Sequence, residues 1–277
     1  MRLGVGLPNS VPGAEPRLLL EWARRADEGT FDSLGVVDRM RYDSLEPMTL
    51  LAAVGACTTR IELVTMVVIG PLRDHAIFGR EAATIHALSG GRLTLGLAVG
   101  ARTDDYDALG VAHQGRGVRL EDQLAALRDA FEAASGPGAG PDLLVGGGSD
   151  ITFVRAARYA DGYVHGGGPP RAFERASSRA ATAWTDAGRP GRPKLWAQAY
   201  FALGDEAGLE RARSYMRDYY AFTGPFAEKI TEGLLTTPQS IVQFVRGYEE
   251  AGCDHLVLLP ALAELGQLDA LAEVVAR

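Results

Sequence analysis

The strongest constraint on the fold is an alternation of short apolar runs with longer stretches of helical periodicity along the whole chain. This pattern is typical of βα units on a parallel sheet. It predicts eight strands, at 2–7, 33–38, 61–67, 93–99, 142–147, 161–166, 194–202 and 254–260. It predicts eight helices, at 16–29, 46–57, 75–89, 115–134, 151–160, 171–188, 205–221 and 238–252. Eight parallel strands close into a single α/β domain, a (β/α)8 or TIM barrel, and 277 residues suit that size.

A doubly wound open sheet is the main alternative to the barrel. It would place a glycine fingerprint for a dinucleotide directly after the first strand, where this chain has Pro8-Asn9-Ser10-Val11-Pro12-Gly13. The barrel is therefore favoured, and its active site is expected among the loops that follow the strands. The segment 215–236 is rich in Tyr and Phe and longer than a simple connection, so it is a candidate lid. Its aromatic residues are candidates either for capping an apolar substrate or for packing.

Charge and cysteine content narrow the classes of partner. The net charge of -7 disfavours nucleic acid and anionic membranes, because counterion release needs a basic patch, so a small-molecule substrate is expected. Cys57 and Cys253 lack the spacing of a disulfide framework or a zinc site. No leader-like or membrane-spanning apolar run is seen, so a cytoplasmic protein is expected.

A cluster of three aspartates is a possible metal site. Asp104, Asp105 and Asp107 lack the glycine and the terminal glutamate of a calcium loop, so no metal is expected. The cluster is interpreted instead as the solvated, acidic start of a helix.

Glycines at the end of the fifth predicted strand form the clearest candidate site. Gly146, Gly147 and Gly148 close the strand, and Ser149 opens the next helix. Bare backbone N–H groups and the positive end of a helix dipole then meet at one corner, where a phosphate can bind. The alternative is a tight turn in which Ser149 is only a helix N-cap. His165 lies at the end of the sixth strand beside Gly166, Gly167 and Gly168, and both His165 and Gly166 are candidates to contact the same anion.

Three stretches of the chain together resemble the bacterial-luciferase-like superfamily of flavin- or F420-dependent oxidoreductases. The first is TRIELVTMV at 59–67, followed by Pro71-Leu72-Arg73. The second is ATIHALSGGR at 83–92, running into LGLAVG at 95–100 and ending at Leu109-Gly110-Val111. The third is LVGGGS at 144–149, followed by AARYADGY at 156–163. Their order and spacing extend the resemblance over nearly the whole chain.

The resemblance implies a flavin-type cofactor at the strand ends. It implies a bulge with a non-proline cis peptide at Met66-Val67 that supports the cofactor ring. The implied cofactor-binding set is Met66, Val67, Val99, Gly147, Gly148, Ser149, His165 and Gly166. It also implies a homodimer, with the helices at 46–57 and 75–89 as the expected contact.

The end of the second strand departs from the family pattern. Asp38 is followed by Arg39, where luciferases and many F420 enzymes carry a histidine that can handle protons near neutral pH. Arginine stays protonated, so Arg39 is a candidate fixed positive charge facing a reduced flavin or a substrate carboxylate, or one half of a surface ion pair with Asp38. The candidate catalytic residues are Asp38, Arg39 and His75. His113 is a further candidate to reach a substrate, while His86 and His255 are expected to be structural.

The favoured function is a monooxygenase that takes reduced FMN from a separate flavin reductase and oxygenates a small organic substrate with O2. The first alternative is an F420-dependent oxidoreductase that transfers hydride. The second is a non-catalytic flavin-binding barrel with an open, wet mouth. A phospho-sugar barrel is disfavoured, because Lys194 and Lys229 offer no obvious catalytic site.

Overall fold

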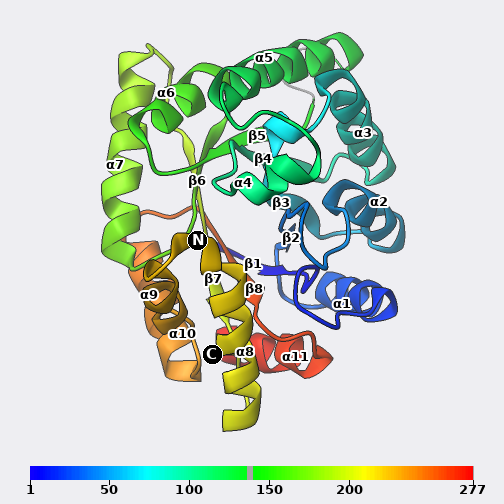
Figure 1. The fold of residues 1–277 in the computed structure, drawn as a ribbon, viewed down its shortest axis with the longest axis vertical. Coiled ribbons are helices and arrows are strands. Elements are labelled where there is room, and N and C mark those ends of the chain that lie inside the picture. The colour runs from blue at the N-terminus through cyan, green and yellow to red at the C-terminus, as the bar shows by residue number, and fades with distance from the viewer. Residues whose placement is uncertain (136–139, 277) are drawn as a thin grey trace.

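The computed structural model describes residues 1–135 and 140–276 and contains a closed barrel of eight parallel strands in chain order, β1 to β8 (Figure 1). The strands are β1 Arg2–Gly6, β2 Ser33–Val36, β3 Glu62–Ile69, β4 Leu93–Ala98, β5 Asp142–Gly146, β6 Gly162–His165, β7 Lys194–Phe201 and β8 His255–Pro260. The predicted (β/α)8 barrel is confirmed. The predicted strands differ from these only at their ends.

The helices form a ring around the barrel. The longer ones are α1 Pro16–Glu28, α2 Pro47–Cys57, α3 His75–Leu88, α5 Arg116–Ser135, α6 Asp150–Tyr159, α7 Pro170–Asp186, α8 Glu206–Tyr219, α10 Pro238–Glu250 and α11 Leu265–Val275. Shorter ones lie in the loops: α4 Thr103–Ala108, α9 Phe226–Glu232, and the 3₁₀ helices η1 Gly70–Leu72 and η2 Ala221–Thr223. The helix predicted at 238–252 precedes β8 as α10. The helix behind β8 is α11, which the sequence pattern did not single out.

Proline and glycine set several of these boundaries. Proline occupies the first turn of α1, α2 and α10, where a missing N–H costs nothing. Thr237 and Ser240 complete a reciprocal capping box at the start of α10. Gly90 and Gly91 follow α3 with φ of 70° and 85°, which turns the chain toward β4.

The barrel interior is a packed core with glycines where the strands come closest. Val64 and Met66 of β3, Val257 of β8 and Trp196 of β7 belong to one buried cluster. A Cβ at Gly35 of β2 would lie 2.9 Å from Val257 Cγ1 and 3.2 Å from Met66 Cγ, so the absence of a side chain makes this packing possible.

A buried histidine lies in the barrel interior at the N-terminal ends of the strands. His255 begins β8, is fully buried, shares a hydrogen bond of 2.8 Å with Ser33 Oγ and stacks on Trp196 at 4.0 Å between ring centroids. Burial lowers the pKa of His255 to about 3, which keeps the ring neutral. Its predicted structural role is consistent with this position, at the strand ends opposite the expected site.

β3 carries the irregularity that the resemblance implied. Its pairing with β4 shifts register between Thr65 and Val68, and the Met66-Val67 peptide bond is cis. Both expected features are therefore present. The bulge brings Val67, which is half-buried, toward the C-terminal end of the barrel.

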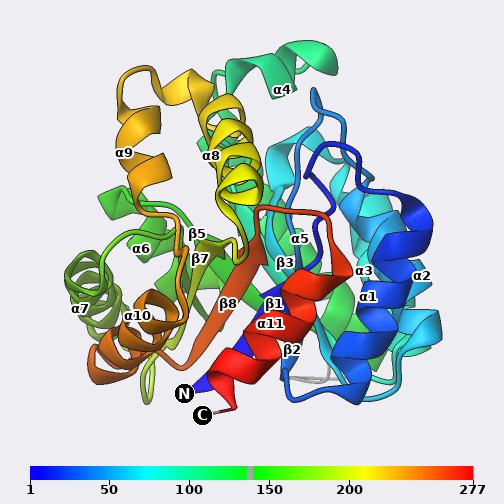
Figure 2. The ribbon, with the colours of Figure 1, turned by 90° about the horizontal axis from the view of Figure 1, so that it is seen from below.

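The two ends of the barrel differ in what covers them. In Figure 2, α4, α8 and α9 lie at the end toward which β8 points, and both chain termini lie at the opposite end. The end carrying α4, α8 and α9 is called the mouth below. It is the end where loops following parallel strands gather, so it is where a site is expected.

Candidate active site

The glycine corner at the end of β5 is exposed at the mouth. Gly147, Gly148, Ser149 and Asp150 are all exposed, so none of the described residues seals the corner. Gly147 has φ of 138°, and a Cβ there would lie 2.8 Å from Thr152 Oγ1, so the turn requires glycine. A Cβ at Gly148 would have no neighbour within 4 Å. The corner therefore presents backbone to open space at the start of α6.

The side chains of the corner leave its amide groups free for an anion. Ser149 occupies the N-cap position, but its hydroxyl pairs with Thr152 Oγ1 at 3.0 Å and makes no side-chain cap. The Asp150 carboxylate forms an ion pair with Arg179 of α7. Its negative charge is therefore compensated by a cation on the neighbouring helix.

Next to the corner lies a small apolar floor formed by three adjacent strands. Val67 of β3 is half-buried, and a Cβ at Gly146 of β5 would lie 3.4 Å from Val67 Cγ1 and 3.7 Å from Ala98 Cβ of β4. A Cβ at Gly96 would lie 2.8 Å from Val67 Cγ1. Glycine at both positions makes room for Val67. Val99 follows β4 half-buried, and its carbonyl accepts a hydrogen bond of 2.5 Å from Tyr106.

Polar atoms from β6 and β7 lie beside the same corner. Tyr163 Oη donates to Gly147 O at 2.8 Å and lies 3.3 Å from His165 Nδ1. Burial lowers the pKa of His165, and its Nε2 is buried without a partner. Gln198 Nε2 donates weakly to Gly166 O at 3.3 Å, while its Oε1 is buried and unpartnered. His165 and Gly166 therefore do lie with the corner, and Gln198 is a neighbour that sequence reasoning did not single out as a site residue.

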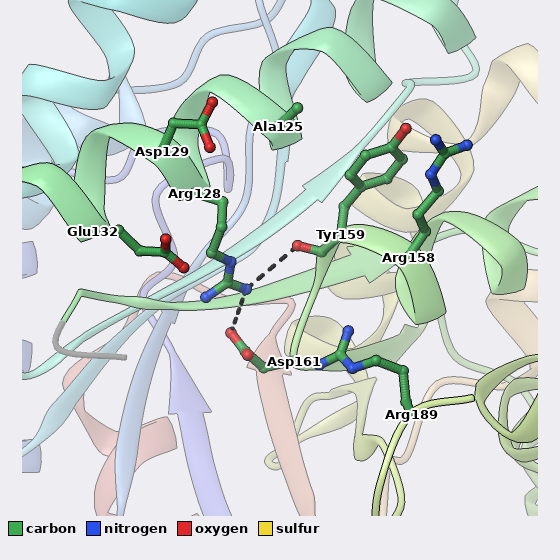
Figure 3. Close-up of a pocket in the computed structure, with 8 residues that line it drawn as sticks. All are labelled: Ala125, Arg128, Asp129, Glu132, Arg158, Tyr159, Asp161 and Arg189. Atoms are coloured by element: carbon green, nitrogen blue, oxygen red, sulfur yellow. Dashed lines mark hydrogen bonds and ion pairs between the residues drawn. The ribbon is translucent and has the colours of Figure 1, made fainter. Parts of the chain in front are cut away.

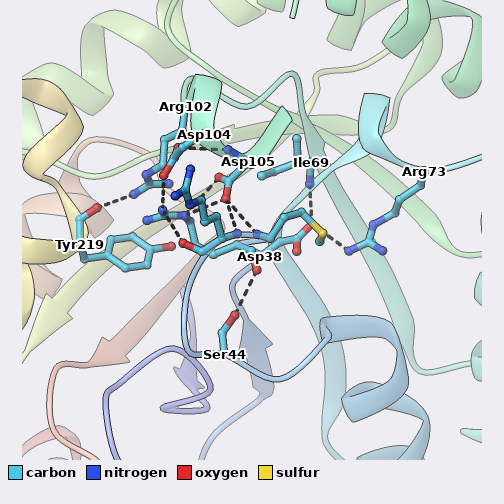
Figure 4. A network of polar contacts seen from close by, with 11 residues as sticks. Asp38, Ser44, Ile69, Arg73, Arg102, Asp104, Asp105 and Tyr219 are labelled. Atoms are coloured by element: carbon cyan, nitrogen blue, oxygen red, sulfur yellow. Dashed lines mark hydrogen bonds and ion pairs between the residues drawn. The ribbon is translucent and has the colours of Figure 1, made fainter. Parts of the chain in front are cut away.

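Asp38 is buried at the junction of β2 and β3. Its Oδ2 accepts hydrogen bonds from Ile69 N and from Arg73 Nη2, both at 2.9 Å (Figure 4). Its Oδ1 is buried and has no partner. Burial raises the pKa of Asp38, while Arg73 and the Ile69 amide oppose this. Oδ2 thus fixes the orientation of the carboxyl, while Oδ1 makes no hydrogen bond within the described residues.

The Arg39 side chain contacts a different set of residues from those that hold Asp38. Its Nε lies 3.1 Å from Asp105 Oδ2, and its Nη2 lies 3.2 Å from Asp104 Oδ2. Its guanidinium also stands 4.9 Å from the Tyr42 ring and 5.3 Å from the Tyr219 ring. Arg39 is 7% exposed and Asp38 is 4% exposed, and they pair with different residues. The alternative of a surface ion pair between them is therefore excluded.

Asp105 is the residue of this network that sequence reasoning misjudged. It is fully buried, and its Oδ1 accepts from Met40 N at 2.9 Å, Arg41 N at 3.0 Å and Arg39 Nε at 3.2 Å. The predicted helix start exists as α4, and Asp107 is exposed. Asp105, however, is not solvated, because it binds the loop that follows β2. No local pattern could show this, since its partners lie more than sixty residues earlier.

The other candidate histidines lie apart from this network. His75 is exposed at the first turn of α3, where Asp74 caps the helix. None of the contacts found for Asp38 or Arg39 in the described residues involves His75. His113 packs against Tyr106 with 5.0 Å between ring centroids. Its predicted reach to a substrate is not evident from these contacts.

The first residues of the candidate lid segment, 215–219, contact three loops at the mouth. Tyr215 Oη shares a hydrogen bond of 2.7 Å with Ser10 Oγ in the loop after β1, and Tyr42 Oη donates to Asp218 Oδ2 at 2.7 Å. Arg102 of the loop after β4 donates to Tyr219 O at 2.8 Å (Figure 4). β4 and β7 are not neighbours in the barrel, so contacts between the loops that follow them bridge the opening.

A hollow of about 440 Å³ lies at the opposite end of the barrel (Figure 3). Its Arg128 pairs with Asp161 at 2.9 Å, and its Arg189 donates to the carbonyls of Ala157 and Ala160 at 2.9 and 3.2 Å. These contacts join α5, α6 and the chain before β7, at the end of the barrel away from the loops that build active sites in such folds. The hollow is interpreted as structural.

Within residues 1–135 and 140–276, no group of three or more His, Cys, Asp or Glu side chains is placed to hold a metal ion. No helix in the same residues has the length and apolar character needed to cross a bilayer.

The family of the chain follows from a match to a family model. The model for luciferase-like monooxygenases matches residues 1–235. The chain belongs to this family. Its closed barrel, the cis peptide in β3 and the glycine corner agree with the resemblance found in the sequence motifs.

Two curated relatives show how far similarity in sequence extends. An uncharacterized protein of Mycobacterium tuberculosis is 33% identical over 162 residues, which cover 52% of this chain and 56% of the relative. The chain thus matches little more than half the length of that relative. An F420-dependent glucose-6-phosphate dehydrogenase of Gordonia bronchialis is 30% identical over 136 residues, covering 47% of this chain and 39% of that enzyme.

Two solved structures show the likeness in fold. An F420-dependent secondary alcohol dehydrogenase in complex with an F420-acetone adduct has a TM-score of 0.85 at 16% identity and covers 99% of this chain and 98% of that chain. The monooxygenase RslO1 from Streptomyces bottropensis has a TM-score of 0.76 at 17% identity and covers 100% of this chain and 98% of that chain.

Proposed function

We propose that this chain is an F420-dependent oxidoreductase that transfers hydride to or from a small organic substrate at the barrel mouth. The observation that carries this proposal is Asp38, a buried carboxyl after β2 with a raised pKa and one oxygen that has no hydrogen-bond partner among the described residues. A hydride transfer to or from a carbonyl or alcohol needs a group that gives or takes a proton. Arg39 cannot do so, and Asp38 can.

The residues present suit a planar cofactor with an anionic tail. Val67, Ala98 and Gly146 form an apolar floor, and the exposed amides at 147–150 with the start of α6 would hold an anionic group. His165 Nε2 and Gln198 Oε1 are buried polar atoms in need of partners at the same corner. The predicted cofactor contacts of Met66 and Val99 remain predictions. F420, when bound, supplies the carbon that donates or accepts hydride.

The protein's own residues would then perform three tasks. The corner binds the anionic tail through backbone N–H groups. Asp38 Oδ1 holds or releases the proton that accompanies hydride transfer, while Arg73 and Ile69 N fix the orientation of the carboxyl. The segment that crosses the mouth excludes water, which strengthens electrostatic interactions beneath it.

A monooxygenase that receives reduced FMN from a separate flavin reductase is the second candidate function. The bridged mouth favours it, because oxygen chemistry on a reduced flavin needs shelter from water. Arg39 is less suited to act as a fixed positive charge facing the reduced flavin in that reaction, since Asp104 and Asp105 already compensate its charge. A non-catalytic barrel would have an open mouth, and the three contacts across the opening argue against that alternative.

Separate titrations with F420 and with reduced FMN under anaerobic conditions distinguish the two candidates. F420 is expected to bind with a dissociation constant of about 1–10 μM, a free energy of roughly -7 to -8 kcal/mol. Reduced FMN is expected to bind at least about tenfold more weakly, a difference of about 1.4 kcal/mol. The reverse order of affinities would reject F420 in favour of the monooxygenase, and binding of neither would reject both.

We also propose that two copies of the chain associate through α2 and α3, which lie side by side on the barrel surface (Figure 1). α3 exposes 61% of Ile77 and 65% of Leu88, apolar surface that a second copy would cover. Light scattering is expected to give twice the 29.5 kDa of one chain, and Ile77→Glu with Leu88→Glu is expected to give a monomer. A wild-type mass of one chain at micromolar concentration would exclude this dimer.

A further inference from the structure

A short helix at the mouth, α4, is held in place by buried contacts with another loop. α4 begins directly after Arg102, and its Asp105 is fully buried against the loop that follows β2. Asp105 binds Arg39 and the amides of Met40 and Arg41, so two loops from non-neighbouring strands are joined by one carboxylate. The position of Arg102 is therefore fixed by a buried ion pair rather than by a free loop.

Arg102 reaches from this anchored helix to the segment that follows β7. Its Nη2 donates to Tyr219 O at 2.8 Å, and its guanidinium lies 4.2 Å from the Phe222 ring and 4.5 Å from the Tyr219 ring. Tyr219 thus has Arg102 and Arg39 near its ring. Its carbonyl and its ring are both engaged by the same arginine, which combines a charge-assisted hydrogen bond with cation–π contact.

The segment beyond Tyr220 is weakly packed, whereas Tyr219 is 5% exposed and Tyr220 packs against the Tyr200 ring. η2 contains no buried residue, and Phe222 is 45% exposed. Burial of apolar surface therefore contributes little to its position, and such segments open locally at low free-energy cost. The contacts made by Ser10 and Tyr42 end at Tyr215 and Tyr219, before η2 begins.

We propose that Arg102 is a latch: a positioning residue that holds η2, residues 221–223, closed over the mouth, while Asp105 and Arg39 hold α4 beside it in place. The consequence for catalysis rests on the proposed function, because a closed segment slows the release of whatever is bound beneath it. The latch itself is a property of the free protein. It does not depend on which cofactor binds.

Hydrogen exchange of the protein without cofactor tests the latch. The amides of Thr223 and Gly224 donate to Tyr220 O and Ala221 O and report on η2. Arg102→Met is expected to speed their exchange at least about tenfold, whereas amides of β3 and β4 exchange as in the wild type. Arg102→Lys keeps a donor but loses the planar stack, so an intermediate rate is expected. Arg211→Met is the matched control, since the one ion pair found for Arg211 in the described residues is an exposed one with Glu264.

The outcomes separate the latch from the proposed function. Exchange at Thr223 and Gly224 within twofold of the wild type in Arg102→Met would overturn the latch. Faster exchange throughout the barrel would also overturn it, because Arg102 would then support the whole fold. Faster local exchange in a protein that binds neither F420 nor FMN would keep the latch and reject the proposed function. If F420 binds, its dissociation rate constant is expected to rise about tenfold in Arg102→Met.

Discussion

Asp38→Asn is expected to lower kcat by about a hundredfold or more, the usual contribution of a positioned general acid or base. Asparagine has nearly the same shape, and its carbonyl oxygen can still accept from Ile69 N and Arg73. It cannot give or take a proton. The barrel should therefore stay folded and bind cofactor, while proton transfer is lost. Steady-state kinetics of both proteins with the same substrate measure the effect.

The dependence on pH gives this prediction a second readout. Burial raises the pKa of Asp38, so its protonated form persists to higher pH than that of an exposed carboxyl. When the substrate is reduced, the carboxyl must be protonated, so the wild-type rate is expected to fall as pH rises through that pKa. In the oxidative direction the same group must be ionised, so the rate is expected to rise. In Asp38→Asn, the pH dependence of the rate is expected to be absent in both directions of the reaction.

Two further variants show whether a loss of rate has a structural cause. Asp38→Ala is expected to be destabilised by about 3–5 kcal/mol, because Arg73 and Ile69 N would lose a buried partner. Glu46→Gln removes the other carboxylate that contacts Arg73 and should leave kcat within about twofold. A kcat for Asp38→Asn within threefold of the wild type would leave Asp38 as only a support for β3.

Gly148→Val is expected to weaken cofactor binding at least about a hundredfold, a loss of about 2.7 kcal/mol. A Cβ at this position meets no protein atom within 4 Å, and Gly148 is not among the glycines with positive φ. The substitution therefore does not strain the protein. It places methyl groups where the anionic tail would approach the amides of the corner.

Equilibrium titration together with thermal unfolding checks this prediction. The melting temperature should stay within about 2 °C of the wild type, since nothing is displaced in the folded state. Gly266→Val is a suitable control, because Gly266 in α11 also has no neighbour within 4 Å of a built Cβ and is remote from the corner. Unchanged affinity in Gly148→Val would mean that the tail binds elsewhere.

The sequence was informative wherever a property is local or repeated. Eight apolar runs predict eight strands because parallel strands are covered on both faces. The run from Gly146 to Ser149 predicts an exposed corner, because the lack of a glycine side chain and the free N–H groups at the start of a helix are properties of a few consecutive residues. The bulge and cis peptide at Met66-Val67 came from resemblance to a family, since no local rule in these residues would have indicated them.

The sequence was uninformative where a role depends on distant partners. Asp105 looked like one of three solvated carboxylates, yet it is the buried anchor of α4, because Arg39 is brought to it by the closing of the barrel. Asp38 and Arg39 looked like a pair because they are adjacent. Their side chains separate toward Arg73 and Asp105, as successive residues at the end of a strand point to different sides. His75 was proposed from position alone, and the structure leaves it exposed and apart from that network.

We expect the corner at 147–150 to bind the anionic tail of a flavin-type cofactor. A crystal structure of the complex with F420, or with FMN if FMN binds more tightly, tests it most directly. The oxygens of the cofactor tail are expected to lie within about 3.2 Å of backbone nitrogens of the corner, and the cofactor ring is expected to lie against Val67 and Ala98. A cofactor whose tail contacts other loops, leaving these amides to solvent, would contradict it.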